Sequence, residues 1–272
     1  MIQELIEVDS LQTQDLEPYL TLRRPQDHQQ QGIFIAEGSK VVLRLLESQH
    51  EIISILLTPE WFQQCETLLQ QHKSSIKVLR GEKSLLEKIV GHHLHQGIMA
   101  LAKIPQSIDE KEIPQKFSSP YFFVVVDGIV SAENMGVIVR NCVAFGVQAL
   151  IVGETSCDPY LRRSVRNSMG TIFHLPIIYS QNLVTTIRYC NSLHIHTIAT
   201  SLSDKSKEIT ELDFSKNCCI IVGNEGYGIS KSVLEVCKTQ AIIPIQKNVD
   251  SLNVGSATAI FLYEVMKQRK NI

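Results

Sequence analysis

Residues 218–228 read CCIIVGNEGYG, a short apolar run followed by a loop that contains three glycines. A Val- and Ile-rich run of this length is typical of a strand that is buried on both faces of a sheet. Three glycines within six residues are unfavourable in a strand or a helix. They favour a loop whose backbone lies close to a ligand, although a tight turn explains the loop equally well. The stretch therefore predicts a buried strand that ends in a glycine-rich loop.

Similar short apolar runs lie on both sides of this stretch, at residues 121–126, 149–152, 172–178, 197–199 and 241–245. Each is separated from the next by a segment with helical patterning. This alternation predicts an α/β fold in which helices cover both faces of a parallel sheet. Ligands of such sheets bind beyond the carboxyl ends of the strands. We therefore expect the functional residues in the loops that follow the strands.

The first part of the chain has a looser pattern of the same kind. Apolar runs at 33–36, 52–57 and 98–102 alternate with helical patterns, which predicts a small α/β domain of about a hundred residues. A polar stretch with three prolines follows at 105–120 and is typical of a connecting segment. We predict a first domain at 1–104, a linker at 105–118 and a second domain at 119–272.

Composition limits the possible classes of protein. The 272 residues include 44% hydrophobic residues, which suffice for two packed cores. No apolar run reaches the length of a membrane span and no secretory signal is visible, so we expect a soluble cytoplasmic protein. A net charge of −2 argues against coating nucleic acid by bulk electrostatics but allows local basic patches. Seven cysteines without a C-x-x-C pair favour buried thiols in a reducing compartment.

The loop after the first predicted strand of the second domain reads DGIVSAENMGVIVR at residues 127–140. We expect Asn134 to cap the following helix, and Gly136 allows the backbone to approach another group closely. Arg140 falls within that helix. A buried guanidinium needs a partner, so Arg140 faces either an acidic side chain or an anionic ligand. The sequence leaves both possibilities open.

A third loop, PIQKNVDSLNVG at residues 244–255, precedes the final helix. Ser251 and Asn253 place a hydroxyl and an amide at the start of that helix, where helix capping is the simpler explanation. The small residues Gly255, Ser256 and Ala257 then permit close packing against another helix or a second subunit.

Taken together, the three loops resemble the signatures of the SpoU-type (TrmH-like) branch of the SPOUT superfamily of RNA methyltransferases. The matches are N-x-G-x-x-x-R at 134–140, G-N-E-G-x-G at 223–228 and S-L-N at 251–253, with a further shared block DPYLRRSVRNSM at 158–169. The first half is similar, more loosely, to the upstream substrate-binding domain that resembles ribosomal protein L30e. That similarity rests on FIAEG at 34–38 and HQGIMA at 95–100.

This resemblance implies AdoMet as the cofactor and a ribose 2′-hydroxyl of RNA as the acceptor. Members of the branch act on rRNA or tRNA, and the two-domain architecture favours rRNA here. The resemblance also implies a homodimer with the site near its interface, a trefoil knot near the C-terminus, and no metal. The implied catalytic residues are Asn134, Arg140, Glu225, Ser251 and Asn253. The implied cofactor-binding residues are Val222, Gly223, Asn224, Gly226, Gly228, Ile243, Ile245, Leu252 and Asn253.

We expect two roles for arginines. Arg140 is a poor base because a guanidinium stays protonated, so we expect it to bind the RNA backbone and stabilise charge on the 2′-oxygen. Arg162, Arg163 and Arg166 form a basic cluster at helical spacing. We favour contacts of this cluster with RNA phosphates over a merely solvated helix face.

Three other interpretations compete. A dinucleotide-dependent oxidoreductase predicts G-x-G-x-x-G after the first strand, where this chain has DGIVSAENMG. A non-catalytic RNA-binding protein of the same fold predicts loss of Arg140 or Asn253, and both are present. A zinc site at His92, His93 and His95 lacks further ligands in the sequence. Ala132 and Glu133 stand where many members of the branch have Asp-Pro, which leaves the target nucleotide open.

Overall fold

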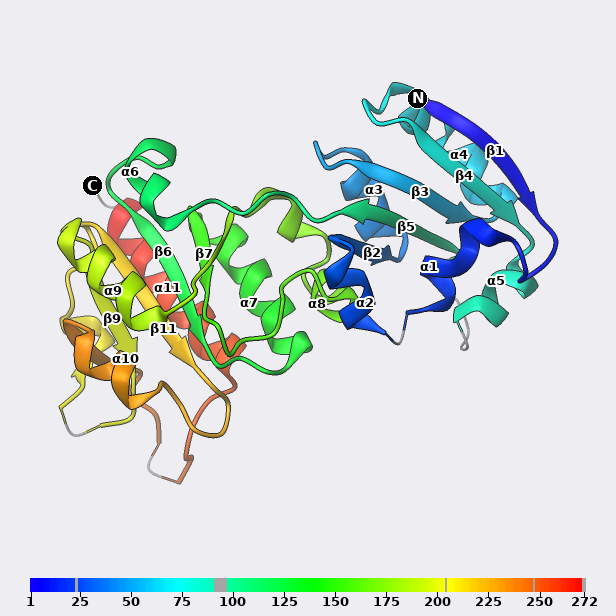
Figure 1. Cartoon of the computed structure of the whole chain (residues 1–272). Helices are drawn as coiled ribbons and strands as arrows, with labels where there is room; N and C mark the ends of the chain where they lie inside the picture. Colours follow the sequence, from blue (N-terminus) through cyan, green and yellow to red (C-terminus); the bar gives the residue numbers. More distant parts are fainter. Residues whose placement is uncertain (23, 91–96, 204, 247, 271–272) are drawn as a thin grey trace. The chain divides into compact units, whose positions relative to one another are not determined.

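The computed structural model describes residues 1–22, 24–90, 97–203, 205–246 and 248–270. The chain forms two compact units, which Figure 1 shows in the colours of the sequence. The first consists of Met1–Gln106 together with Tyr160–Phe173, and the second of Ser107–Pro159 together with His174–Ile272. Each unit has a sheet covered by helices, so the predicted α/β class is confirmed. The return of Tyr160–Phe173 to the first unit was not expected from the sequence.

The first unit is built on a five-stranded sheet in the order β1-β4-β3-β5-β2. β4 runs parallel to its two neighbours, whereas β5 is antiparallel to both β3 and β2. The apolar runs of the first half form three of these strands as predicted. The strands are β1 (Ile2–Val8), β2 (Ile33–Glu37), β3 (Ile52–Leu57), β4 (Ile76–Gly81) and β5 (Ile98–Lys103).

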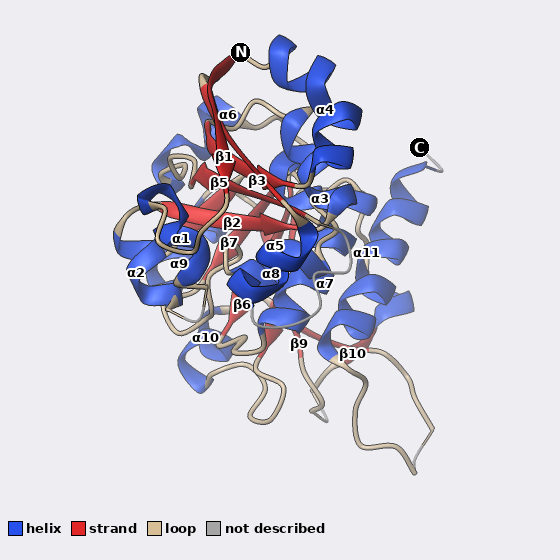
Figure 2. Cartoon of the chain, turned by 90° about the vertical axis from the view of Figure 1, so that its right-hand side faces the viewer, coloured by secondary structure: helices blue, strands red, loops and turns tan. Residues whose placement is uncertain are grey.

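Helices cover this sheet and bury its apolar side chains. α3 and α4 contact each other on the sheet (Figure 2), while Tyr19 of α1 and Leu86 of α5 belong to a separate core cluster. The helices are α1 (Glu17–Leu20), α2 (Pro25–Gln30), α3 (Ser39–Leu46), α4 (Pro59–Gln71), α5 (Lys83–Val90) and α8 (Arg162–Asn167), with a 3-10 turn η1 (Gln14–Leu16).

An aromatic cluster explains why Tyr160–Phe173 belongs to the first unit. The ring of Phe34 on β2 lies 5.1 Å from that of Tyr160 and 5.9 Å from that of Phe173, measured between centroids. All three rings are buried. The strand expected at 172–178 is therefore wrong at its start, because Thr171–His174 forms the 3-10 turn η3 and carries Phe173 into the first core.

The second unit contains a seven-stranded, wholly parallel sheet in the order β10-β12-β9-β11-β6-β7-β8. The predicted parallel sheet is thus confirmed. β10 is a two-residue edge strand that was not predicted, because it contains no apolar run. The strands are β6 (Phe122–Asp127), β7 (Ala149–Val152), β8 (Ile177–Tyr179), β9 (His196–Thr200), β10 (Lys207–Glu208), β11 (Cys218–Gly223) and β12 (Thr239–Ile242).

Two layers of helices enclose this sheet. α9 and α10 pack on the side chains of Phe123 and Cys219, whereas Arg269 of α11 lies over the ring of Phe122 at 4.9 Å. α7 packs along α11. Successive strand residues point to opposite faces, so these helix pairs cover opposite sides. The helices are α6 (Ile113–Lys116), α7 (Ala132–Ala144), α9 (Leu183–Ser192), α10 (Lys231–Val236) and α11 (Val254–Lys270), with 3-10 turns η2 (Glu110–Glu112) and η4 (Ile209–Glu211).

The stretch predicted as a linker packs on the second unit from residue 107 onward. Ile113 of α6 is completely buried in the core beneath α9, and Ile108 and Phe117 pack against the same cluster. The backbone N–H of Ile108 donates to the carbonyl of Ile177 on β8 at 3.2 Å. Among the described residues, no helix is both long and apolar enough to cross a membrane.

Candidate active site

The carboxyl ends of β6 and β11 lie side by side, and the two loops that follow them are hydrogen-bonded together. Asp127 and Gly223 are direct partners at the ends of these strands. The side-chain amide of Asn224 donates to the carbonyl of Gly128 at 2.7 Å, and the N–H of Ser230 donates to Asp127 Oδ2 at 2.8 Å. At β6 the strand order turns from one direction along the sheet to the other, which is where ligands of parallel sheets bind.

The glycine-rich loop after β11 is a closed turn. Asn224 and Gly228 exchange backbone hydrogen bonds of 3.0 and 2.9 Å, and Asn224 Oδ1 accepts from the N–H groups of Gly226 and Tyr227. Gly228 has φ of 71°, and a Cβ on Gly223 would lie 2.4 Å from the backbone of Gly228. Turn geometry therefore accounts for these two glycines without any ligand.

A chain of side-chain hydrogen bonds joins the three loops. Asn253 Nδ2 donates to Asn134 Oδ1 at 3.1 Å, and Asn134 Nδ2 donates to Glu225 Oε1 at 2.8 Å. The structure thus brings together three of the five residues that the family resemblance implied as catalytic. We refer to Asn253, Asn134 and Glu225 as the amide chain.

Asn134 lies within the first turn of helix α7 and is not its N-cap residue. Ser131 is the N-cap residue, and its hydroxyl accepts the N–H of Asn134 at 3.2 Å. The prediction that Asn134 caps the helix is therefore wrong. The capping serine three positions earlier leaves the whole carboxamide of Asn134 free for the amide chain.

Asn253 combines helix capping with a place in the site. Its Oδ1 accepts the N–H of Gly255 at 2.9 Å at the start of α11, and its Nδ2 reaches Asn134. Both interpretations of this residue from the sequence therefore hold together. Capping fixes the side chain so that its amide points at Asn134.

A cavity of about 610 Å³ opens beside the amide chain. Its wall consists of the ends of β9, β11 and β12, the two loops that follow β11 and β12, and the first turns of α11. Of the implied cofactor-binding residues only Val222, fully buried within β11, lies outside the wall. Those that line it are Gly223, Asn224, Gly226, Gly228, Ile243, Ile245, Leu252 and Asn253; the wall also includes Ser251 of the implied catalytic set.

The sequence did not indicate every residue of this wall. Thr200 ends β9, Ser201 and Leu202 follow it, and all three line the same cavity. They belong to no glycine-rich or polar motif. The signal that could have found them is their position after a predicted strand of the same parallel sheet.

Arg140 stands apart from the amide chain. It is exposed on α7, and no hydrogen bond or ion pair joins it to another described residue. Six helical positions separate it from Asn134, which is a rotation of about 600° and places the two side chains on different faces. The acidic partner that the sequence left open is therefore not present in the described part of this chain.

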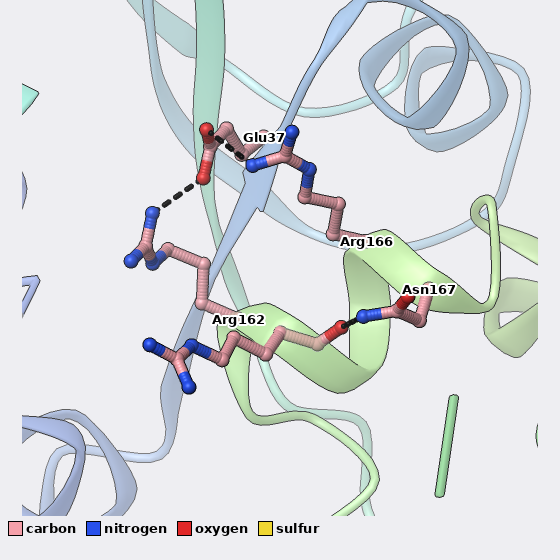
Figure 3. A network of polar contacts seen from close by, with 5 residues as sticks. Glu37, Arg162, Arg166 and Asn167 are labelled. Atoms are coloured by element: carbon pink, nitrogen blue, oxygen red, sulfur yellow. Dashed lines mark hydrogen bonds and ion pairs between the residues drawn. The ribbon is translucent and has the colours of Figure 1, made fainter. Parts of the chain in front are cut away.

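Two of the arginines expected to bind RNA form ion pairs within the first unit. Glu37, at the end of β2 in the first unit, is only 6% exposed. One carboxylate oxygen accepts from Arg162 at 2.5 Å and the other from Arg166 at 3.2 Å (Figure 3). The side chain of Arg166 remains 55% exposed, whereas that of Arg162 is 23% exposed. A carboxylate so buried needs positive partners, which gives both arginines a structural role.

No cysteine or histidine among the described residues lines the cavity. All seven cysteines are free. Burial raises the pKa of the Cys190 thiol to about 12 and that of Cys157 to about 11, so both stay protonated at neutral pH. His92, His93 and His95, the candidate metal ligands, lie outside the described residues. Within the described ranges, no group of three His, Cys, Asp or Glu side chains could hold a metal ion.

The helices that carry the site are closely packed against each other. The side-chain amide of Asn141 on α7 donates to the carbonyl of Gly255 on α11 at 2.8 Å. A Cβ on Gly255 would lie 2.6 Å from Cγ1 of Val137. The small residue at position 255 is therefore explained by the approach of α7.

Two protein-family models match this chain, one in its first part and one in its second part. The model of the SpoU rRNA methylase family matches residues 121–263. The model for the substrate-binding domain of RNA 2′-O ribose methyltransferases matches residues 35–108.

Among curated proteins, the 23S rRNA (guanosine-2′-O-)-methyltransferase RlmB of Shewanella oneidensis is 30% identical over 210 residues, covering 75% of this chain and 84% of the relative. The protein of the same name from Coxiella burnetii is 29% identical over 215 residues, covering 76% and 84%. An AdoMet-bound rRNA methyltransferase from Sinorhizobium meliloti has the same fold, with a TM-score of 0.84 at 24% identity over 97% of this chain and 98% of that one.

Proposed function

The chain belongs to the SpoU rRNA methylase family, and we propose that it methylates a ribose 2′-hydroxyl of ribosomal RNA with AdoMet as the methyl donor. The single observation that carries this proposal is the amide chain Asn253–Asn134–Glu225, whose two end residues line the cavity. It places a carboxylate and two carboxamides, groups that bind hydroxyls, beside a space of the size that small cofactors occupy.

The residues around the cavity fit AdoMet. Leu202, Ile243, Ile245 and Leu252 offer apolar surface for an adenine ring, and the loop 223–228 offers backbone polar groups for the ribose and the amino-acid part. When bound there, AdoMet supplies a methyl group that is already activated by its sulfonium. The residues of the chain then have to orient the ribose and assist the loss of its proton.

The amide chain defines what these residues do. Asn253 is fixed by capping α11, it holds Asn134, and Asn134 holds Oε1 of Glu225. We assign Glu225 to the ribose, because its second oxygen has no partner among the described residues. Ser251, which is exposed on the cavity wall, adds a hydroxyl that orients the same sugar.

Arg140 has a separate role in the proposal. It binds the RNA backbone and stabilises negative charge that develops on the 2′-oxygen. Arg140 and Asn134 lie on different faces of α7. We therefore place Arg140 in the active site of the partner protomer, next to which α7 lies in a dimer. A guanidinium without an internal partner is available for such a contact.

A homodimer is supported by apolar side chains on the helices α7 and α11. Val137, Ile260 and Tyr263 are 37%, 40% and 53% exposed. Val137 and Arg140 are three residues apart on α7 and therefore share one face. An interface centred on these helices covers the apolar side chains and brings Arg140 to the second protomer. The trefoil knot implied by the family resemblance stays a prediction.

The first unit is proposed to hold the RNA. Its match to substrate-binding domains supports this role. We retain Arg162, Arg163 and Arg166 as RNA contacts. Of the two that pair with Glu37, Arg166 is better placed than Arg162 to bind RNA, because more than half of its side chain is exposed. Ribosomal RNA as substrate also favours a cytoplasmic site of action.

The proposal is tested by transfer of labelled methyl from AdoMet to unmodified rRNA and to tRNA in separate reactions, with the products digested to nucleosides. A 2′-O-methyl nucleoside from rRNA is the expected result. The same product from tRNA alone corrects the substrate, and a methylated base overturns the chemistry. No transfer to either RNA, with AdoMet still bound, points to a narrower substrate such as an assembling ribosomal particle. No binding of AdoMet favours a non-catalytic RNA-binding protein of the same fold.

A further inference from the structure

Tyr227 is the most exposed large apolar side chain among the described residues, at 96% of its possible surface. It occupies the variable position of the glycine-rich loop and lines the same cavity as Gly226 and Gly228. A ring so exposed contributes nothing to the packing of this chain. Because it also lines the cavity, its face is available to a bound ligand.

The backbone beneath this ring is firmly held. The N–H of Tyr227 donates to Asn224 Oδ1 at 3.0 Å, and the paired hydrogen bonds between Asn224 and Gly228 close the turn. Asn224 is itself tied to the loop after β6 through the carbonyl of Gly128. The ring is thus presented from a fixed point at the rim of the cavity, which lowers the conformational entropy lost on binding.

We propose that the ring of Tyr227 is a stacking platform for the nucleobase of the nucleotide that is methylated. This inference rests on the proposed function and assigns one contact within it. Glu225 and Tyr227 are two residues apart, at most about 7 Å along the backbone. A ribose held at Glu225 therefore brings its own base within reach of the Tyr227 ring. Aromatic side chains stack on any base, so the contact positions the nucleotide without selecting its identity.

Two other occupants of this ring are less consistent with its surroundings. A ring that packs on the adenine of a cofactor inside the cavity would be partly covered by the other residues of the cavity wall. Tyr227 is instead almost completely exposed. A ring in the dimer interface would extend the exposed apolar face of Val137, Ile260 and Tyr263, none of which lines the cavity, whereas Tyr227 does. An exposed ring on the cavity wall is accessible to an incoming nucleotide.

The experiment compares the wild-type chain with three variants of this position. Tyr227→Ala removes the ring, Tyr227→Leu keeps an apolar side chain without a π face, and Tyr227→Phe keeps the ring without its hydroxyl. For each protein we measure KM and kcat for RNA, Kd for AdoMet by calorimetry, and oligomeric state by light scattering. Since nothing packs on the ring, each variant is expected to fold, and circular dichroism with a thermal melt checks this independently of AdoMet binding.

We expect KM for RNA to rise by about tenfold in Tyr227→Ala and Tyr227→Leu, and to stay within about twofold of wild type in Tyr227→Phe. A tenfold change corresponds to about 1.4 kcal/mol. AdoMet affinity and oligomeric state are expected to stay unchanged in all three.

Each alternative has its own signature. Weaker AdoMet binding in Tyr227→Ala assigns the ring to the cofactor, and dissociation of the oligomer assigns it to the partner subunit. Equal KM values in all four proteins show that the ring binds nothing in the reaction. Any of these results overturns the stacking role while the wild-type enzyme still methylates RNA. If the wild-type chain itself transfers no methyl group to RNA, the result contradicts the proposed function rather than the stacking role of Tyr227.

Discussion

Asn134 Nδ2 donates a hydrogen bond of 2.8 Å to Glu225 Oε1, although the two residues are 91 positions apart in the sequence. The contact joins the helix after β6 to the loop after β11, at the point where the ribose is proposed to bind. Asn134 is also the only described residue seen to bond with Glu225. The orientation of this carboxylate therefore depends on one carboxamide.

Replacing that carboxamide by a carboxylate tests this dependence. Asn134→Asp removes the donor and places a second negative charge beside Glu225, so the two carboxylates repel each other. We expect kcat to fall by about a hundredfold, since misplacing a positioning group by about an ångström has an effect of that size. Methyl transfer to RNA measures the loss. Unchanged kcat in Asn134→Asp contradicts a role for the amide chain.

Arg140→Ala is expected to lower turnover by at least about a hundredfold while leaving AdoMet affinity unchanged. The guanidinium is exposed and makes no hydrogen bond within the described part of the chain, so its removal does not disturb folding. Arg188→Ala, at another exposed arginine on α9, is the matched control. Equal turnover in wild type and Arg140→Ala rules out charge stabilisation by this residue.

The proposed homodimer predicts an effect of charge on the exposed face of α11. Ile260 is 40% exposed, so Ile260→Asp is compatible with the folded chain but unfavourable in an apolar interface. We expect the variant to sediment as a monomer and to lose methyl transfer. Leu11→Asp, at an equally exposed apolar position of the first unit, should leave both properties unchanged. A dimeric Ile260→Asp places the interface elsewhere.

Glu37→Gln should destabilise the first unit. The substitution keeps the shape of the side chain but removes the charge that pairs with Arg162 and Arg166. We expect the free energy of unfolding to fall by about 2 kcal/mol, the range for hydrogen bonds to charged groups. Urea titration measures the change. Glu7→Gln, which breaks a surface ion pair with Arg80, is the control and should have little effect. A comparable loss in both variants would mean that burial of Glu37 does not matter.

We expect two histidines of the first unit to make stability depend on pH. Burial lowers the pKa of both His28 and His72 below the ordinary value of 6.5, and the nearby N-terminal ammonium lowers that of His72 further. The unfolded chain therefore takes up protons first as the pH falls. Stability is complete above pH 6.5 and decreases as the pH falls through that value towards the lower folded-state pKa.

The urea midpoint should accordingly drop between about pH 7 and about pH 5. Protonation of His72 also breaks a hydrogen bond, because its Nδ1 accepts the N–H of Ser74 at 3.1 Å. His72→Gln keeps a side-chain acceptor that does not titrate, so it should reduce the slope to the part that His28 contributes. A slope that is the same in this variant excludes His72 as a source of the pH dependence.

Strands could be predicted from the sequence where both of their faces are buried. β7 and β11 consist of residues that are all buried, and their apolar runs were visible without a structure. β1 and β4 were missed because partly exposed polar residues interrupt their apolar positions. Such strands lack the continuous run, and only their neighbours in the sheet reveal them.

The candidate site was predictable as a set of motifs but not as an arrangement. The motifs identified Asn134, Glu225 and Asn253, which the structure brings together. They also suggested that Arg140 belongs with them, although it lies on a different face of α7. The role of Glu37 was hidden for a similar reason, because its partners are 125 and 129 residues away. Contacts across such separations depend on tertiary packing, which local patterns do not encode.

The return of Tyr160–Phe173 to the first unit has a consequence for modular exchange. The chain passes between the two units at residues 106–107, 159–160 and 173–174. A chimera that takes only residues 1–106 from a relative would replace Glu37 and Phe34 but keep the old Arg162, Tyr160 and Phe173. A chimera that exchanges the substrate-binding unit between members of the family therefore has to exchange residues 1–106 and 160–173 together.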